Sequence, residues 1–361
     1  MTRVDANLAW LVPGRVGGSE EYTVRLLCAA AESRPADIDL RLIGSSALFA
    51  AHPELAEIEH VVLGGPVRFR PWRVASESTS VFRLTRTADV VHHFGGRVPA
   101  RHHGNDVVTI HDLQPLQMPE NFSLVKRRYL AVALPRSVAT ARLVVTPSEW
   151  VASTVVDVLG ADPSRLRAVS STWDVSTEID PTLASSLGEG PVVLYPAITH
   201  PHKRHLLLLD AIGRLADAHP RVTVVLTGGE GRAEDEVREA VARSAVRVVR
   251  PGRVTAASLR GLYERADLLV FPSAYEGFGL PVLEAMRIGL PVVASDQTAL
   301  PEVLGDTGTL VAGDDPAVWA AAIADALVDG RERSAGAPAR AERWSPTRAA
   351  ARLVAAWRSV V

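Results

Sequence analysis

Cysteine is almost absent from the 361-residue sequence: Cys28 is the only one, and it lies in an apolar stretch with helical spacing. A single cysteine excludes a disulfide bond and a cysteine-ligated zinc site within one chain. Long hydrophobic runs are missing too. The amino terminus is not apolar enough for a signal peptide, and no later run reaches the length that spans a bilayer. These absences predict a protein of a reducing compartment, the cytoplasm.

The sequence also lacks an excess of charge of either sign. Its 39 Lys and Arg residues nearly balance 41 Asp and Glu residues, so no long-range field draws the chain to nucleic acid or to an anionic membrane. We therefore expect no nucleic-acid partner. Lysine itself is scarce, because only Lys126 and Lys203 interrupt a chain that otherwise uses arginine. A lysine here indicates a place where a compact point charge is favoured.

Short apolar runs alternate with amphipathic stretches along the whole chain. The predicted strands contain LAWLV, LRLIG, HVVLG, DVVHHF, VVTIHDL and LVVTPS in the first half, and VVLYPA, VTVVLTG, VRVV, LLVFPS, PVVAS and TLVAG in the second. Strands that alternate with helices predict parallel sheets covered on both faces. Because the chain is longer than one core usually serves, we predict an α/β protein with two doubly wound, Rossmann-like domains.

A stretch rich in Ser, Thr, Asp and Pro interrupts this alternation. It predicts a linker at residues 173–190, between a first domain at 1–172 and a second at 191–343. The two sheets are expected to face each other across a cleft.

The segment WSPTRAAARLVAAW predicts a terminal helix within residues 344–361. Ser345 is a candidate N-cap and Pro346 suits the first helical position. Apolar residues recur at helical spacing up to Trp357, so one face of this helix has to be buried. We predict that the helix crosses back onto the first domain.

The most informative segment is FPSAYEGFGLPVLEAMRIGLPVVAS, residues 271–295. A predicted strand ends at Pro272, a glycine-containing loop carries Glu276, and Pro281 starts a helix with Glu284 in its first turn. Loops at the carboxyl ends of parallel strands bind ligands, and a helix amino terminus favours a diphosphate. Taken singly, Glu276 could also be a solvated charge in a loop. Glu284 could also be an acidic residue that interacts favourably with the helix dipole.

This segment resembles the donor-site signature of the large family 4 of retaining glycosyltransferases, whose two-domain fold is called GT-B. The resemblance implies that Glu276 contacts hydroxyls of the transferred sugar and is a catalytic residue. It implies that Glu284 contacts the ribose of the nucleotide. It also implies that backbone amides line the sugar and diphosphate at Gly277, Phe278, Gly279 and Leu280.

A second element, YPAITHPHKRHLLLLDAI, follows the first strand of the second domain. Lys203 is predicted to open the next helix, where an ammonium reaches a phosphate. The element is similar to the diphosphate-binding lysine region of family 4, with Arg204 where relatives have asparagine. The second phosphate-binding arginine of many relatives is missing, since Ile198 and Thr199 occupy that neighbourhood; Arg204 or another cation is expected to replace it. The alternative for Lys203 is a surface residue of the helix.

The histidines around Lys203 do not predict a metal site. His200, His202 and His205 lack a nearby acidic or cysteine ligand in the sequence. We therefore expect no metal and no cofactor, and the nucleotide sugar itself is a substrate.

The first domain begins with a glycine loop, a weak signal that dinucleotide-binding enzymes share. The second predicted strand does not end in the acidic residue that would hold a nicotinamide nucleotide. The family resemblance instead implies that amides at Gly17 and Gly18 face the donor diphosphate. His111 and Asp112, beyond a later strand, match a catalytic histidine and an aspartate near the transferred sugar. The alternative for His111 is a buried residue that orients its loop.

Three weaker features complete the candidates. The first is the pair His92 and His93 at the end of a strand. The second is the glycine-rich segment TGGEGR, residues 227–232, which also fits a plain tight turn. The third is RPGRVT, in which Val254 matches the place where family members contact the base.

One predicted helix carries a basic cluster of Lys126, Arg127, Arg128 and Arg136. It fits either a solvated helix face or a peripheral contact with the inner membrane face, where a lipid-linked acceptor lies.

Together the residues and the resemblance predict a retaining hexosyltransferase that moves a sugar from a nucleoside-diphosphate sugar to a hydroxyl group. The acceptor is expected to be a glycan, a lipid-linked molecule or a small molecule. The HDLQP and PHKRH regions are similar to those of bacterial surface-polysaccharide mannosyltransferases, so GDP-mannose is the expected donor, with UDP- and dTDP-sugars as alternatives. A GT-B epimerase or phosphorylase and a non-catalytic nucleotide- or sugar-binding protein remain as other classes.

Overall fold

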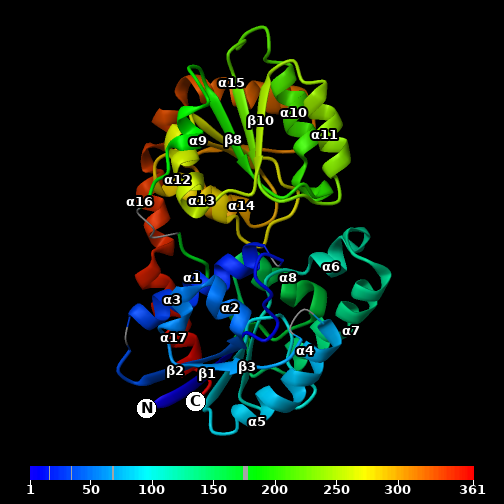
Figure 1. Cartoon of the computed structure of the whole chain (residues 1–361), viewed down its shortest axis with the longest axis vertical. Helices are drawn as coiled ribbons and strands as arrows, with labels where there is room; N and C mark the ends of the chain where they lie inside the picture. The colour runs from blue at the N-terminus through cyan, green and yellow to red at the C-terminus, as the bar shows by residue number, and fades with distance from the viewer. Residues whose placement is uncertain (16, 34, 67–68, 174–177) are drawn as a thin grey trace. The chain divides into compact units, whose positions relative to one another are not determined.

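The computed structural model describes residues 1–15, 17–33, 35–66, 69–173 and 178–361. The chain divides into two compact units (Figure 1): residues 1–172 with 344–361 form the first, and residues 173–343 form the second. Each unit has its own parallel sheet with helices packed on it. The predicted α/β class with two Rossmann-like domains is therefore confirmed.

The first unit contains a seven-stranded sheet in the order β3-β2-β1-β4-β5-β6-β7. The strands are β1 (Thr2–Asn7), β2 (Ile38–Ser45), β3 (His60–Leu63), β4 (Val90–His93), β5 (Asp106–Thr109), β6 (Leu143–Thr146) and β7 (Leu166–Ala168). The main helices are α1 (Gly18–Glu32), α2 (Ser46–Ala51), α3 (Pro53–Ala56), α4 (Arg70–Ser76), α5 (Phe82–Leu84), α6 (Gln114–Gln117), α7 (Leu124–Thr140), α8 (Glu149–Leu159) and α17 (Pro346–Arg358). Successive strand residues point to opposite faces, so Val107 lies in one apolar core and Val108 in another.

The last helix, α17, packs in the first unit although the second unit precedes it in the chain. Ser345 is its N-cap and Pro346 its first residue, as predicted. Leu353 and Trp357 are fully buried in the core that α1 also lines, and the indole of Trp357 donates to Nδ1 of His92 at 3.0 Å. Full burial of one such side chain contributes about 1.5–3 kcal/mol. The predicted return of the terminal helix is confirmed.

The second unit contains a six-stranded parallel sheet in the order β10-β9-β8-β11-β12-β13. The strands are β8 (Val192–Pro196), β9 (Thr223–Thr227), β10 (Arg247–Gly252), β11 (Leu268–Phe271), β12 (Val292–Ser295) and β13 (Thr309–Val311). The main helices are α9 (Thr182–Ser185), α10 (His205–Gly213), α11 (Glu234–Ala242), α12 (Ala256–Arg265), α13 (Leu280–Arg287), α14 (Leu300–Leu304), α15 (Pro316–Arg333) and α16 (Ala337–Ala341). In neither unit does a helix of the described ranges combine the length and hydropathy needed to cross a bilayer.

The first strand differs from its prediction. LAWLV, residues 8–12, is predicted as a strand, but β1 ends at Asn7 and the prediction is wrong. The amide of Leu8 still bonds the carbonyl of Ile43, after which the amide of Leu11 bonds the carbonyl of Leu8 and closes a turn. A buried turn and a buried strand need the same apolar composition, so the run alone does not separate them.

The segment predicted as a linker, residues 173–190, contains secondary structure. Its helix α9 packs against α12 within the second unit, and Asp180 accepts a hydrogen bond from the hydroxyl of Ser258 at 2.6 Å. A Cβ atom at Gly261 would lie 2.3 Å from the carbonyl oxygen of Asp180, so the glycine permits this packing. Residues 174–177 of the segment lie outside the described residues.

Each sheet has one place where the direction of its connections reverses, between β1 and β4 in the first unit and between β8 and β11 in the second. Open α/β sheets bind ligands outside the carboxyl ends of strands at such a point. A ligand site is therefore expected in the loops after these strands.

Candidate functional site

In the second unit, the loop after β8 carries Lys203 and Arg204. Lys203 ends a 3-10 turn that begins at Pro201, and α10 starts only at His205, so the prediction that Lys203 opens the helix is wrong. Arg204 separates turn and helix in a left-handed conformation, with φ at 53°. The hydroxyl of Tyr195, in β8, donates to the carbonyl of Lys203 at 2.5 Å. This contact fixes the turn over the strand end.

The loop after β11 brings Glu276 to Lys203. The amide of Ala274 donates to the carbonyl of His202 at 2.8 Å and ties the two loops together. Nζ of Lys203 then lies 2.5 Å from Oε1 of Glu276, and both side chains are largely buried. The two residues predicted for the phosphate and the sugar thus form one ion pair at the strand edge. Each charge compensates the other where burial alone would be costly.

The helix after this loop starts earlier than predicted. Gly279 is its N-cap with φ at 106°, and α13 begins at Leu280. Glu284 is therefore in the second turn, and its predicted place in the first turn is wrong. A Cβ atom at Gly279 would lie 2.7 Å from Cδ2 of Leu300, so glycine is needed here for its conformation and for space. The positive end of the α13 dipole lies at this glycine, next to the loop that carries Glu276, and it favours an anion.

Thr298, in the loop after β12, is a residue that the sequence reasoning missed. Its hydroxyl oxygen accepts a hydrogen bond from the amide of Glu276 at 3.1 Å. Its φ is 58°, a left-handed conformation that costs a β-branched residue about 1–3 kcal/mol and often marks functional sites. Among the described residues only Arg204 and Thr298 have a positive φ without being glycine. Both flank the ion pair, and no sequence pattern signals a threonine in this conformation.

Arg204 is the second cation at this edge. Its Nη2 lies 2.8 Å from Oδ1 of Asp314, which follows β13, while its buried Nη1 has no hydrogen-bond partner in the described part of the chain. Two neighbouring histidines, His202 and His205, add no charge. Burial, followed by the nearby Lys203, lowers the pKa of His202 to about 3, and burial lowers the pKa of His205 to about 4. At neutral pH Lys203 and Arg204 therefore carry positive charge in this loop, and His202 and His205 do not.

The glycine turn after β9 packs against the loop after β8. A Cβ atom at Gly228 would lie 2.4 Å from the carbonyl oxygen of Ala197, and one at Gly231 would lie 2.5 Å from that of Thr199. The glycines therefore serve loop packing. Val254 follows β10, whose Gly252 accepts a bond from the amide of Gly228 at 2.9 Å. The base contact at Val254 remains a prediction.

In the first unit, the glycine loop after β1 leads into α1. Gly17 is the N-cap with φ at 63°, and a Cβ atom at Gly17 or Gly18 would meet nothing within 4 Å. Glu20 stabilises the loop, because its carboxylate accepts a hydrogen bond from the amide of Gly14 at 2.8 Å. The same carboxylate lies 2.9 Å from Nε2 of His52. The two glycines thus border open space at a helix amino terminus.

His111 lies just beyond β5, against the rings of Trp10 and Tyr22. Its Nε2 is 2.7 Å from the carbonyl oxygen of Phe94, and since a carbonyl only accepts, Nε2 carries the proton. Burial lowers the pKa of His111 to about 4. It is a neutral imidazole with its lone pair on Nδ1. Asp112 accepts a hydrogen bond from the amide of Gln114 at 3.0 Å, where α6 begins.

The other histidine candidates belong to the core of the first unit. Both side chains are buried. His92 bonds Trp357 and Thr109. His93 bonds Asn7 and, at 2.8 Å, Asp106. In the described residues, no group of three or more His, Cys, Asp and Glu side chains is arranged to hold a metal ion.

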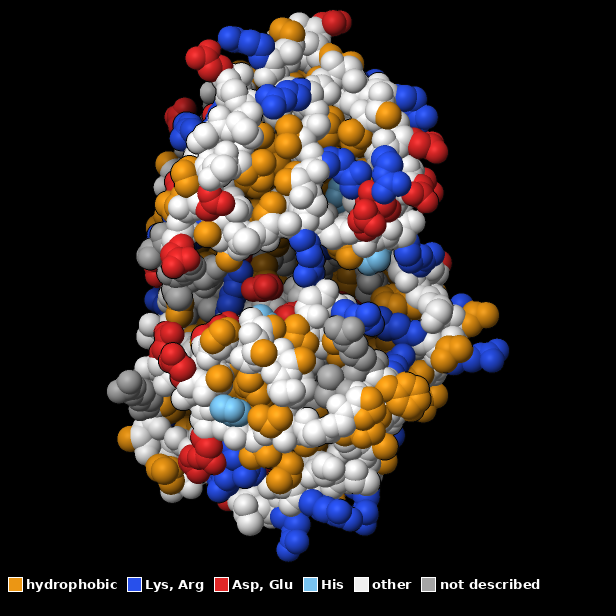
Figure 2. Space-filling model, in the orientation of Figure 1, with side chains coloured by type: hydrophobic (Ala, Val, Ile, Leu, Met, Phe, Trp, Pro, Cys, Tyr) orange, Lys and Arg blue, Asp and Glu red, His pale blue; other side chains and the backbone are white. Residues whose placement is uncertain are grey.

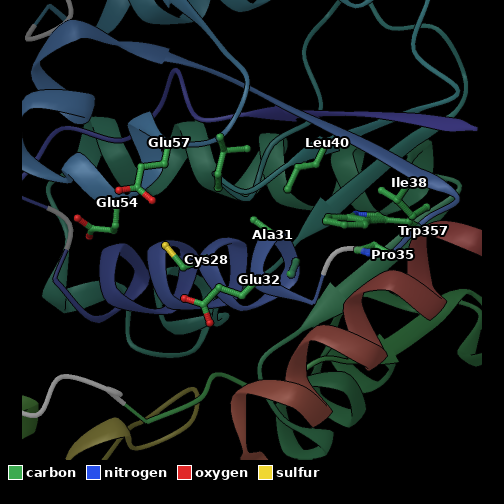
Figure 3. A pocket seen from close by; sticks show the side chains of 11 residues that line it. Cys28, Ala31, Glu32, Pro35, Ile38, Leu40, Glu54, Glu57 and Trp357 are labelled. Atoms are coloured by element: carbon green, nitrogen blue, oxygen red, sulfur yellow. The ribbon is translucent and has the colours of Figure 1, made fainter.

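A pocket of about 380 Å³ lies in the first unit near the start of β2 (Figure 3), and no predicted site residue lines it. Cys28 and Glu32 project into it from α1, with Glu54 and Glu57 opposite. Burial, followed by the neighbouring glutamates, raises the pKa of the Cys28 thiol to about 12. The thiol stays protonated at neutral pH, so it is a poor nucleophile.

Comparisons with known proteins identify the family of this chain. Residues 16–176 match the family described as "Glycosyltransferase Family 4", and residues 190–329 match "Glycosyl transferases group 1". The chain is 28% identical over 276 residues to O-antigen chain mannosyltransferase B of Escherichia coli, which covers 73% of this chain and 72% of that protein. It is 34% identical over 196 residues to D-inositol 3-phosphate glycosyltransferase 2 of Catenulispora acidiphila, which covers 49% of this chain and 45% of that protein.

A solved structure with the same fold is Anabaena HepE, determined in complex with UDP and glucose. It superposes with a TM-score of 0.76 at 21% identity and covers 99% of this chain and 100% of that chain. The two family matches together span most of the sequence and both units. The chain therefore belongs to the family 4 type of glycosyltransferases and is a hexosyltransferase with the GT-B fold.

Proposed function

We propose that this enzyme transfers a hexosyl group from a nucleoside-diphosphate sugar, with retention of configuration. We propose that the donor binds in the second unit, at the loops that follow the carboxyl ends of β8 and β11. The observation that carries the proposal is the meeting of Lys203 and Glu276 at 2.5 Å beside the start of α13. An ammonium and a helix amino terminus suit a diphosphate, while a carboxylate suits sugar hydroxyls. The complex of HepE with UDP and glucose supports this donor class.

The reaction breaks the bond between the anomeric carbon and the diphosphate oxygen, and forms a bond from that carbon to the acceptor oxygen. Negative charge develops on the leaving diphosphate. Lys203, Arg204 and the amides from Gly277 to Leu280 stabilise it, as preorganised donors do in transition states. The acceptor hydroxyl proton passes to the leaving diphosphate oxygen on the same face. We propose these groups, and no divalent metal, for charge stabilisation.

The other proposed contacts concern sugar, ribose and acceptor. Glu276 orients the transferred sugar and Glu284 contacts the ribose, while Gly17 and Gly18 contribute amides from the first unit. His111 is neutral with its lone pair on Nδ1, so it accepts a hydrogen bond from a hydroxyl of the sugar or acceptor. The acceptor is proposed to be a glycan or a lipid-linked molecule.

We propose GDP-mannose as the donor, because mannosyltransferases of O-antigen chains are among the relatives. The test is a thermal-shift panel of GDP, UDP, dTDP and ADP. A ligand at one hundred times its dissociation constant stabilises the native state by about 2.7 kcal/mol, and GDP should raise the melting temperature most. A larger shift with UDP or dTDP would show that the donor carries that base and not guanine. No shift with any of the four would contradict nucleotide binding.

Thr298 gives a matched pair of variants for the sugar contact. Thr298→Val keeps the shape and the left-handed strain but removes the acceptor of the Glu276 amide. Leaving a partly buried amide without a hydrogen-bond acceptor costs about 1–3 kcal/mol, so kcat/KM for transfer should fall about tenfold. Thr298→Ser should restore it, and nucleoside diphosphate affinity should not change in either variant. An equal kcat/KM for the Thr298→Val and Thr298→Ser variants would show that Thr298 does not position Glu276.

A further inference from the structure

Helix α7 presents apolar side chains to solvent. Its opposite stripe is buried through Leu134 and Val138, which pack in the first unit. On the outward side Leu124, Val125 and Val132 are 70%, 78% and 69% exposed. Their spacing places all three within one half of the helix surface. Single exposed apolar residues are ordinary, but several on one face indicate a contact surface.

The segment that contains these residues is also rich in basic side chains. Residues 121–148 contain no Asp or Glu, while Lys126, Arg127, Arg128 and Arg136 lie on α7. All four of these cations are exposed. The whole chain has a formal net charge of −2, so this positive field is a local property of α7 and its surroundings.

The start of α4 extends the surface. The guanidinium of Arg70 lies over the ring of Tyr129 in α7, 4.5 Å from its centre, and Phe69 beside it is 59% exposed. Residues 60–76 again contain no acidic residue. In Figure 2, hydrophobic and basic side chains adjoin at the right of the view, where Figure 1 draws α4 and α7. We call Phe69, Arg70, Leu124, Val125, Arg127, Arg128 and Val132 the α4–α7 face.

We propose that the α4–α7 face docks on an anionic lipid bilayer. Phe69, Leu124, Val125 and Val132 enter the boundary between headgroups and acyl chains, and the basic side chains bind the headgroup phosphates. Interfacial binding needs both buried apolar area and attraction to anionic lipid, and this face supplies both. A helix face that meets only solvent would account for the basic residues but not for the exposed apolar ones. Docking is reversible and sensitive to salt, because exposed charges are screened.

Vesicle flotation tests the proposal without any sugar transfer. The full chain is mixed with phosphatidylcholine vesicles that contain or lack phosphatidylglycerol, at low and at high salt. We expect binding only to the anionic vesicles, with release at high salt. Each basic residue near the surface is worth roughly fivefold in partitioning, so Arg127→Glu with Arg128→Glu should abolish binding. Failure of the parent protein to bind anionic vesicles would overturn the proposal.

A second pair of variants separates lipid insertion from charge alone. Val125→Ser with Val132→Ser leaves every charge in place and should weaken partitioning about tenfold, because the valines lose apolar burial in the bilayer. Val328→Ser in α15 is the control, since Val328 is 84% exposed but lies in the other unit; it should bind as the parent does. Unchanged binding of the valine pair would mean general attraction to polyanions and would contradict docking. Melting temperature and GDP affinity verify that each variant is folded.

Discussion

Replacing Glu276 by alanine is expected to lower kcat/KM for sugar transfer by about 10²- to 10⁴-fold. The proposed carboxylate accepts hydrogen bonds from hydroxyls of the transferred sugar, and each bond to a charged group is worth about 1.5–3 kcal/mol. Two such bonds correspond to that loss, since each 1.36 kcal/mol is tenfold in rate. Nucleoside diphosphate lacks the sugar, and Lys203 loses the carboxylate that lies 2.5 Å away. Affinity for the diphosphate should therefore equal or exceed that of the parent.

Two controls make this result specific. Glu264→Ala removes an exposed glutamate of the same unit that pairs with Arg260 on α12, and it should leave transfer unchanged. Glu276→Gln keeps the shape but weakens the acceptor, so its activity should fall between parent and alanine variant. Transfer by Glu276→Ala at the parent rate would remove Glu276 from the sugar site. Loss of diphosphate binding together with transfer would indicate a disturbed loop instead.

The fold could be predicted because its local signals agree with one another. Buried parallel strands need continuous apolar runs, and these runs alternate with amphipathic helices in both halves. The return of α17 was predictable from Ser345, Pro346 and an apolar stripe that needed a partner. The extent of β1 was not, because the apolar run Leu8–Val12 fits a buried turn as well as a strand.

The candidate site could be predicted only in its parts. Two separate motifs identified Lys203 and Glu276. The two residues are 73 positions apart in the sequence, and their contact depends on β8 and β11 being neighbours in the sheet. Glu284 falls in the second turn because α13 begins at Leu280, one residue before the predicted start at Pro281. Thr298 has no signal in the sequence, since its conformation is imposed by the surrounding loops against its own preference.

The ammonium of Lys203 is proposed to bind the donor diphosphate at the carboxyl ends of β8 and β11. The rest of the mechanism depends on this contact. A charge-assisted hydrogen bond of this kind is worth about 1.5–3 kcal/mol, so Lys203→Ala should bind the nucleotide roughly 10- to 100-fold more weakly. Lys203→Arg keeps the charge and should recover part of the loss. Arg214→Ala, which removes an exposed cation just after α10, serves as the matched control and should not change affinity.

Calorimetric titration of GDP into the parent protein and these variants is the direct measurement, with the melting temperature confirming that each variant is folded. We predict clearly weaker binding for Lys203→Ala, whereas Glu276→Ala should not weaken binding. A dissociation constant for Lys203→Ala equal to that of the parent would contradict the proposed donor site.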